Sequence, residues 1–200
     1  MNPPPQLPPH LTPAASAHLD AYLALLLLWN ARINLTAVRE PAAIVRRHFL
    51  ESLFAAEHIP ARAKTLLDFG SGAGFPGIPI AIARPRIAVT LAESQSKKAA
   101  FLREVVRTLD LKAEVWPARV ESMPPQRVFD AITLRAVDRM PQACRTAVAR
   151  LAPGGSLLVF ATPKTEAALD AIPSIRWQTA IPIPGADQAT LRIGTAPDSR

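Results

Sequence analysis

Apolar residues recur every three or four positions in the first quarter of the chain, and this spacing predicts helices. Two segments carry the pattern, residues 14–30 and residues 41–57. The stretch between them, WNARINLTAVRE, is polar and predicts a structured loop. The side chains expected to face inward are Leu19, Leu23, Leu26 and Leu27 in the first helix and Ile44, Phe49, Leu50 and Leu53 in the second.

The pattern changes at residue 64, where short apolar runs begin to alternate with helical segments. Such alternation is typical of an α/β fold with a mostly parallel, seven-stranded sheet and helices on both faces. The expected strands are Thr65–Phe69, Ala88–Ala92, Ala113–Pro117, Phe129–Leu134, Ser156–Ala161, Trp177–Ile183 and Ala189–Gly194, the last two forming an antiparallel hairpin. The expected helices are Pro76–Ala83, Lys97–Leu109 and Arg139–Leu151, and Pro153–Gly155 is expected to form a turn.

The chain divides into three regions by this pattern. Residues 1–13, MNPPPQLPPHLTP, are rich in proline and are expected to be extended or disordered. Residues 14–63 are expected to form a helical cap. Residues 64–200 are then a single nucleotide-binding domain.

Glycine is scarce in this chain, yet four of its 8 glycines fall within LLDFGSGAGFPG, residues 66–77. A strand, a glycine turn and a helix in this order form a nucleotide site at the carboxyl end of a parallel strand. Glycine suits the turn because it adopts positive φ and lets a ligand approach the backbone. The motif satisfies G-x-G-x-x-G, which NAD enzymes and S-adenosylmethionine methyltransferases share, and a tight turn without a ligand is the alternative.

Later segments place polar side chains just outside the carboxyl ends of the strands, where ligands bind in such sheets. Glu93 can accept both hydroxyls of a ribose, although it could also be a surface carboxylate. Val120 and Glu121 are equally consistent with an adenine contact and with a solvated loop. Arg135 is expected to face the reacting centre, unless it pairs with a helix carboxylate instead.

Other polar or reactive side chains have simpler interpretations. His48 is expected to pack or cap, because the sequence shows no partners that would make it part of a triad. Cys144 lies within a predicted helix and is expected to be a small core residue. Lys97 and Lys98 open a helix, where they could contact phosphate or form a solvated face.

The charge balance favours a polyanionic partner, because 23 Lys and Arg against 16 Asp and Glu give a net charge of +7. A single cysteine excludes an internal disulfide and fits a reducing compartment. The longest apolar run, Leu23–Trp29, is far shorter than the roughly 18 residues of a membrane span. We therefore expect a cytoplasmic monomer with no membrane segment and, lacking a His/Cys cluster of suitable spacing, no metal site.

Five separated segments match one pattern: WNARINLTAVRE, RRHFLESL, LLDFGSGAGFPGIPIAIARP, LAESQSKKAAFLRE and FDAITLRAV. In this combination the chain resembles the bacterial ribosomal RNA small-subunit methyltransferase G, also called glucose-inhibited division protein B, over about residues 23–163. The resemblance implies a Rossmann-like, S-adenosylmethionine-dependent enzyme. It also implies methyl transfer to N7 of a guanine, guanosine 527, in the 530 loop of 16S ribosomal RNA. The implied partner is this RNA, either alone or within the 30S subunit.

The resemblance also implies roles for individual residues. Arg135 would lie between cofactor and target, as the candidate catalytic residue, and the segments of Asn34, Arg46 and His48 would lie near the RNA. The chain departs from the family pattern near the substrate, with Leu134 in place of the usual serine and no Lys-Gly pair in 161–164. The implied cofactor-binding residues are Gly70, Gly72, Gly74, Phe75, Glu93, Val120, Glu121 and Arg135.

The chemistry of this substrate suits the residues available. Guanine N7 has a lone pair and no proton, so its methylation needs no general base. Two other functions fit less well. An NAD-dependent oxidoreductase would need a catalytic group such as Tyr-x-x-x-Lys, but Tyr22 is the only tyrosine. A non-catalytic RNA-binding protein would not need the intact glycine loop and Glu93.

Overall fold

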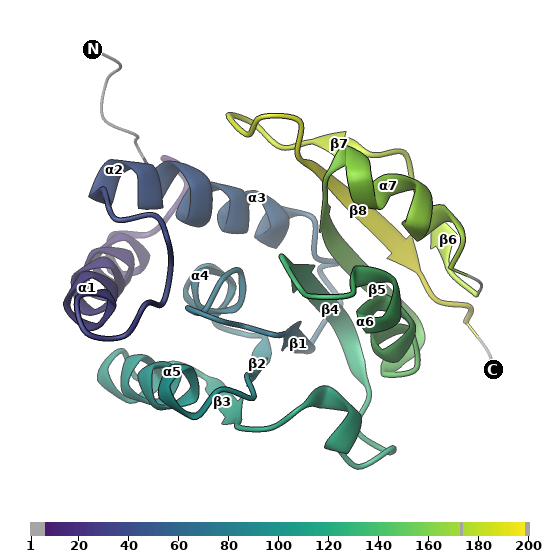
Figure 1. The fold of residues 1–200 in the computed structure, drawn as a ribbon, viewed down its shortest axis with the longest axis horizontal. Coiled ribbons are helices and arrows are strands. Elements are labelled where there is room, and N and C mark those ends of the chain that lie inside the picture. Colours follow the sequence, from purple (N-terminus) through teal and green to yellow (C-terminus); the bar gives the residue numbers. More distant parts are fainter. Residues whose placement is uncertain (1–6, 173, 199–200) are drawn as a thin grey trace.

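The computed structural model describes residues 7–172 and 174–198, which fold around a single sheet (Figure 1). Its strand order is β3-β2-β1-β4-β5-β8-β6, and β7 also pairs with β8. The first five strands in this order are parallel, whereas β8 is antiparallel to β5, and β6 and β7 are antiparallel to β8. The strands are β1 (Thr65–Phe69), β2 (Ala88–Ala92), β3 (Ala113–Trp116), β4 (Phe129–Arg135), β5 (Leu151–Ala161), β6 (Arg176–Trp177), β7 (Ile181–Pro182) and β8 (Thr190–Thr195).

Helices cover both faces of the sheet, as the alternation predicted, because buried strands present apolar side chains to both sides. Leu66 of β1 belongs to a cluster with residues of α1, α3, α4 and α5. The adjacent Leu67 belongs to a second cluster, with residues of α6 and α7. The helices are α1 (Pro13–Asn30), α2 (Pro41–Ile44), α3 (Glu51–Glu57), α4 (Gly77–Ala83), α5 (Ser96–Thr108), α6 (Met140–Val148) and α7 (Pro163–Asp170).

The carboxy-terminal part of the sheet differs in detail from the sequence prediction. The expected turn Pro153–Gly155 is wrong, since these residues lie inside β5, at a point where its register with β4 shifts. Gly154 has φ +65° at this irregularity, which glycine permits. Because β5 begins at Leu151, α6 ends three residues before the predicted bound. The expected strand Trp177–Ile183 is divided into β6 and β7, so the sheet has eight strands rather than seven.

Helix α7 was not predicted, although the sequence carries its start signal. Pro163 occupies the first helical turn, where proline is favoured. Thr165 Oγ1 accepts a hydrogen bond from the Thr162 N–H at 2.9 Å, as in a capping box.

The cap helices pack directly on the sheet domain. The predicted helix 41–57 is continuous but contains a π-helical turn, η1 (Val45–Leu50), between α2 and α3. Leu50 is only partly buried there, whereas Glu51 is buried. In α1, Tyr22 is fully buried, although the leucine pattern did not predict it as a core residue. None of the helices in the described parts of the chain is long and apolar enough to cross a membrane.

Part of the predicted tail is ordered against this core. Residues 1–6 lie outside the described residues. Leu7 and Leu11 pack against the cap side of the core, and Thr12 Oγ1 accepts the Ala15 N–H at 3.2 Å to cap α1. The division into a cap, 14–63, and a methyltransferase domain, 64–200, stays a prediction, and one cluster of buried residues spans the proposed boundary.

We expect the replacement Tyr22→Phe to lower the free energy of unfolding. The Tyr22 hydroxyl is buried and donates to the Ala73 carbonyl at 2.5 Å, tying α1 to the glycine loop. Removing it leaves a buried carbonyl without its partner, at a cost of about 1–3 kcal/mol. Urea denaturation measures the change. Leu28→Ala, at an exposed position of the same helix, is the control and should alter stability by less than about 0.5 kcal/mol.

Candidate functional site

A cavity of about 760 Å³ lies at the carboxyl ends of β1, β2 and β4, bordered on another side by the cap. Four stretches of the sheet domain line it, and each follows a strand. Those stretches are Phe69–Ala73 with Phe75, Ala92–Gln95 with Lys98, Ala118–Glu121, and Arg135–Arg139 with Gln142 and Ala143. The cap contributes Leu35, Thr36 and His48.

The glycine loop exposes bare backbone to this cavity. Gly70 and Gly72 have φ of +71° and +58°. A Cβ at Gly72 would meet only the Gly70 carbonyl within 4 Å, at 3.9 Å, so the space beside it is open. Gly74 does not line the cavity. Its φ is +99°, and a Cβ there would meet Ile78 Cγ1 at 2.7 Å and the Tyr22 hydroxyl at 2.8 Å, so both backbone conformation and packing against α4 and α1 require glycine.

Below the loop, Asp68 is buried and holds the start of α4. Its Oδ2 accepts the Gly77 N–H at 3.1 Å, and its Oδ1 accepts the Thr133 hydroxyl at 2.8 Å. Burial raises the pKa of Asp68 to about 6, although these hydrogen bonds lower it in part. The carboxylate therefore connects β1, β4 and α4 next to the glycine loop.

Glu93 lies at the cavity edge of β2, as predicted, and is largely buried. Its Oε2 accepts the Gly72 N–H at 3.0 Å and its Oε1 accepts the Gln95 N–H at 2.7 Å. Each oxygen retains a further lone pair for a ligand hydroxyl. Glu93 thus fixes the glycine loop to the start of α5 while keeping acceptor capacity.

The structure brings Val120 and Glu121 to the same cavity. They belong to a single 3₁₀ turn, η2 (Val120–Ser122), after β3. Val120 is buried, and Glu121 is exposed. Lys98 also lines the cavity, near the start of α5.

Arg135 lines the cavity, but its guanidinium is turned towards the cap. Nη2 lies 2.6 Å from Glu51 Oε2 and also donates to the Arg47 carbonyl. The guanidinium carbon lies 5.2 Å from the centre of the Phe160 ring. Burial lowers the pKa of Arg135, and the charge of Glu51 opposes that shift. The sequence left open whether this arginine pairs with a helix carboxylate, and the structure contains that pair.

His48 has partners that the sequence prediction missed. Its Nδ1 lies 3.1 Å from Arg135 Nη2, and its Nε2 lies 3.1 Å from Thr36 Oγ1. Because arginine only donates, Nδ1 must accept, and the neutral ring carries its proton on Nε2. The ring packs on Phe75 with the centroids 4.7 Å apart. Burial, and then the charge of Arg135, lower the pKa of His48 to about 4.

A signal for this network was present in the sequence. His48 and Glu51 are three residues apart in HFLESL and therefore lie on one face of a helix. Their partner on β4 is more than eighty residues away in the chain. Spacing within the helix could have identified the pair, but it could not have identified Arg135 as the partner.

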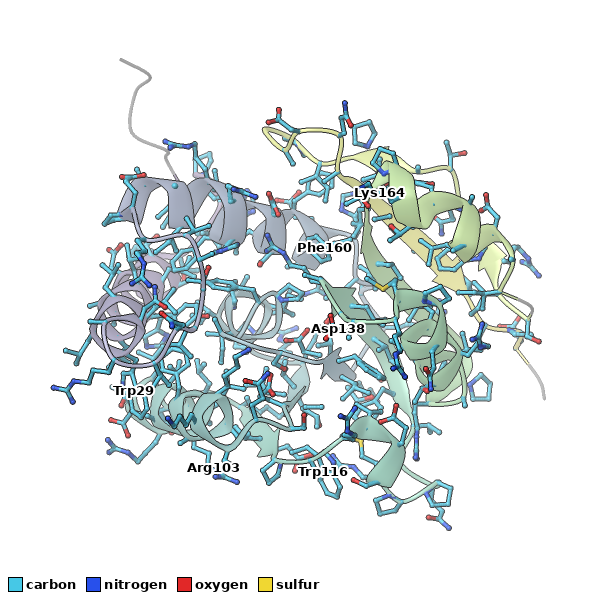
Figure 2. All side chains as sticks on the ribbon, viewed as in Figure 1. Trp29, Arg103, Trp116, Asp138, Phe160 and Lys164 are labelled. Carbon is cyan, nitrogen blue, oxygen red and sulfur yellow. The ribbon has the colours of Figure 1, made fainter. Side chains whose placement is uncertain are left out.

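The remaining candidates lie outside this network. Cys144 is buried in α6, which confirms the prediction of a core residue, and burial raises its pKa to about 12. Lys164 is exposed at the start of α7, and in Figure 2 it lies apart from the cavity residue Asp138. Asn34 and Arg46 are exposed. The Asn34 Oδ1 accepts a hydrogen bond from Arg39 Nη2 at 2.9 Å. Within the described residues, no cluster of His, Cys, Asp and Glu could hold a metal ion.

The residues of the cavity fit S-adenosylmethionine, the ligand that the sequence resemblance implies. The open backbone at Gly72 allows close approach of a ligand. Each carboxylate oxygen of Glu93 retains a lone pair of the kind that a ribose hydroxyl needs as an acceptor. Phe69, Ala92 and Val120 supply apolar surface for a purine ring, and they are all buried cavity residues.

We expect His48 to make stability depend on pH. The unfolded chain protonates this histidine near pH 6.5 and the folded chain only near pH 4. The contribution of His48 to the free energy of unfolding is therefore full above pH 6.5 and falls as the pH drops to about 4, by up to about 3 kcal/mol. Urea denaturation of wild type and His48→Asn at neutral pH and at about pH 4.5 measures it. A stability difference that does not change with pH would contradict the assignment.

Comparison with known proteins agrees with this geometry. Residues 15–174 match the GidB family, described as rRNA small subunit methyltransferase G. The chain is 46% identical over 151 residues to the ribosomal RNA small subunit methyltransferase G of Xanthomonas oryzae pv. oryzae, covering 75% of this chain and 70% of that one. It is 40% identical over 179 residues to the protein of the same name from Stenotrophomonas maltophilia, covering 88% and 84%.

The fold also has solved counterparts. The O-methyltransferase from Bacillus cereus, in complex with SAH, has a TM-score of 0.63 to this chain at 17% identity, covering 88% of this chain and 91% of that chain. This likeness confirms a Rossmann-like methyltransferase fold. The family match extends from α1 of the cap to the segment after α7, and so includes every part of the cavity wall. The chain belongs to the rRNA small subunit methyltransferase G family.

Proposed function

We propose that this protein transfers the methyl group of S-adenosylmethionine to N7 of a guanine, guanosine 527, in the 530 loop of 16S ribosomal RNA. Family membership supports the coarser statement, that it is an S-adenosylmethionine-dependent methyltransferase of small-subunit ribosomal RNA. The observation that carries the proposal is the cavity at the strand ends, where the open backbone at Gly72 and the carboxylate of Glu93 fit the cofactor. The choice of N7 follows from the sequence resemblance. It is compatible with His48, because both ring nitrogens already have partners and the pKa is lowered to about 4, so this residue is not placed to act as a general base.

The cavity residues have complementary roles in this proposal. S-adenosylmethionine, when bound, supplies a methyl group activated by a sulfonium. Gly70 and Gly72 offer backbone without side chains, Glu93 accepts the ribose hydroxyls, and the turn at Val120 and Glu121 contacts the adenine. These residues hold one end of the ligand at the β1–β2–β3 side, so that its reacting end faces Arg135 and the cap.

Catalysis then depends on alignment. Holding the ring nitrogen in line with the methyl group lowers the barrier by several kcal/mol through orientation alone. In model reactions the same effect is on the order of 7–11 kcal/mol. Arginine commonly contacts guanine through O6 and N7 together, but that contact would cover the atom to be methylated. Arg135 therefore engages O6, a phosphate or the cofactor carboxylate, and leaves N7 free.

Two earlier alternatives have less support. Tyr22 is buried and donates to Ala73, so it cannot act in an NAD-dependent reduction at the cavity. A non-catalytic RNA-binding role does not account for the cavity, in which the glycine loop and Glu93 keep the features of a nucleoside site. We further propose that the protein acts as a monomer in the cytoplasm, on 30S subunits or their RNA.

Mapping of ribosomal RNA by mass spectrometry tests the proposed base and atom. Small-subunit RNA from cells with this protein should contain one 7-methylguanosine in the 530 loop, and RNA from cells lacking it should not. Glu93→Gln tests the site, because it keeps the side-chain volume but removes the charge that holds the ribose. Methylation at another base, or unchanged methylation after deletion, would contradict the proposal.

We expect RNA affinity to fall with salt, because binding releases counterions from neutralised phosphates. The loop at 31–40 carries exposed Arg32 and Arg39. Alanine at either should reduce the slope of log affinity against log salt by about 0.7–0.9 if it contacts a phosphate. Arg86→Ala is the control, since Arg86 is exposed just before β2, at the amino-terminal ends of the strands and away from the cavity. Slopes that match wild type for both loop variants would show that the loop does not contact the RNA backbone.

A further inference from the structure

A buried ion pair joins the sheet to the cap beside the cavity. Arg135 Nη2 on β4 and Glu51 Oε2 on α3 lie 2.6 Å apart, and their side chains are only 15% and 10% exposed. Their positions differ by 84 residues in the chain. The pair therefore fixes one point of the cap to the carboxyl end of the central strand.

Stability alone does not account for this pair. Two charges removed from water lose hydration, and apolar side chains of similar volume often give equal or greater stability. What an ion pair supplies instead is a defined geometry, because the planar guanidinium meets a carboxylate in a preferred orientation. Phe160 adds to this by packing its ring against the guanidinium, at 5.2 Å.

Hydrogen bonds extend the contact into the loop of the cap. His48 Nδ1 accepts from Arg135, and His48 Nε2 donates to the Thr36 hydroxyl. Asn30 Oδ1 holds that part of the loop by accepting the Leu35 and Thr36 N–H groups at 2.8 and 3.0 Å. A continuous chain of contacts thus runs from the loop 31–40 through His48 to Arg135 and Glu51.

One terminal nitrogen of the guanidinium has no partner among the described residues. Arg135 Nη1 is buried and has no hydrogen-bond partner in the described part of the protein. Nη2, by contrast, has two hydrogens and lies against three acceptors, Glu51 Oε2, the Arg47 carbonyl and, at the longest distance of 3.1 Å, His48 Nδ1, so one hydrogen is shared. The cap therefore holds Arg135 through one nitrogen and does not use the other.

We infer that Glu51 and His48 are positioning residues, which hold Arg135 at the edge of the cavity and connect its position to the loop 31–40. Glu51 does not line the cavity, and acts through Arg135. The inference rests on the proposed methyl transfer, in which Arg135 contacts the substrate or the cofactor.

A double-mutant cycle tests this inference with 30S subunits as substrate and with calorimetric binding of S-adenosylhomocysteine as a second readout. Glu51→Gln keeps the volume but loses the charge, and should lower kcat by about 10- to 100-fold. Glu51→Asp keeps the carboxylate and should recover most of the loss. Because Glu51 acts through Arg135, the variant Glu51→Gln/Arg135→Lys should be no slower than Arg135→Lys alone. Losses that add in the double variant, or Glu51→Gln with wild-type kcat, would overturn the inference.

The chain offers a matched control in a second pair of the same chemistry. Glu166 Oε2 on α7 lies 2.5 Å from Arg192 Nη1 on β8, and neither residue lines the cavity. Glu166→Gln should lower the melting temperature and leave kcat unchanged. If wild type and Glu166→Gln fail to methylate 30S subunits, the proposed function fails. If wild type, Glu166→Gln and Glu51→Gln all methylate 30S subunits at the same rate, only the positioning role fails.

Two variants of His48 give an independent result should Glu51→Gln not fold. The asparagine of His48→Asn can place an acceptor near the position of Nδ1, and the glutamine of His48→Gln can place a donor near that of Nε2. If the contact with Arg135 matters, the asparagine variant should retain more kcat, and its binding of S-adenosylhomocysteine should remain closer to that of wild type. A faster glutamine variant, or equal rates for the two, would contradict a role for His48 through Arg135.

Discussion

The parallel register of the central strands is the constraint on which the cavity depends. Phe69 at the end of β1 pairs with Ala92 of β2 on one side and with Leu134 of β4 on the other. The residues next in register, Gly70 and Glu93 just after β1 and β2 and Arg135 at the end of β4, therefore emerge side by side. A slip of one residue would turn every side chain of a strand to the opposite face and would bury the wrong set. The apolar clusters on both faces prevent such a slip, so the core fixes the order and spacing of the site.

Three charged groups next to the cavity, Arg135, Glu51 and Asp68, have partners within the protein and little access to water. Arg135 is paired with Glu51, and Asp68 accepts hydrogen bonds from Thr133 and Gly77. His48 is held neutral because burial and the neighbouring guanidinium both oppose its protonation. Groups fixed in this way need little reorganisation when charge moves during a reaction. The protein pays for this arrangement in lost hydration, and the surrounding core supplies the stability that permits it.

The sequence predicted those parts that depend on local pattern. Alternating apolar runs located β1 to β4 to within one residue at either end, and adjacency to strand ends located Glu93, Val120, Glu121 and Arg135 on the cavity wall. The prediction from the sequence failed where contacts with distant parts of the chain determine the structure. Pro153–Gly155 has the composition of a turn, but Leu151 and Ser156 on either side of it pair with β4, and Gly154 and Gly155 form backbone hydrogen bonds with the segment after β8, so these residues lie in an irregular strand. The partners of His48 and the packing role of Gly74 were likewise set by segments far away in the chain.

Several contacts hold the cap against the cavity wall, and they have a consequence for RNA recognition. The Tyr22 hydroxyl holds the glycine loop at Ala73, and Glu51 holds the end of β4 at Arg135. A shift of the cap would have to break a buried hydrogen bond and a buried ion pair, each of which is costly to leave unpaired. The exposed arginines of the loop 31–40 therefore belong to the same packed unit as the residues of the cavity wall. A nucleic acid that binds this loop meets a surface whose distance from the cavity is already set, so that binding the RNA backbone also determines how far a base must extend to reach the cavity.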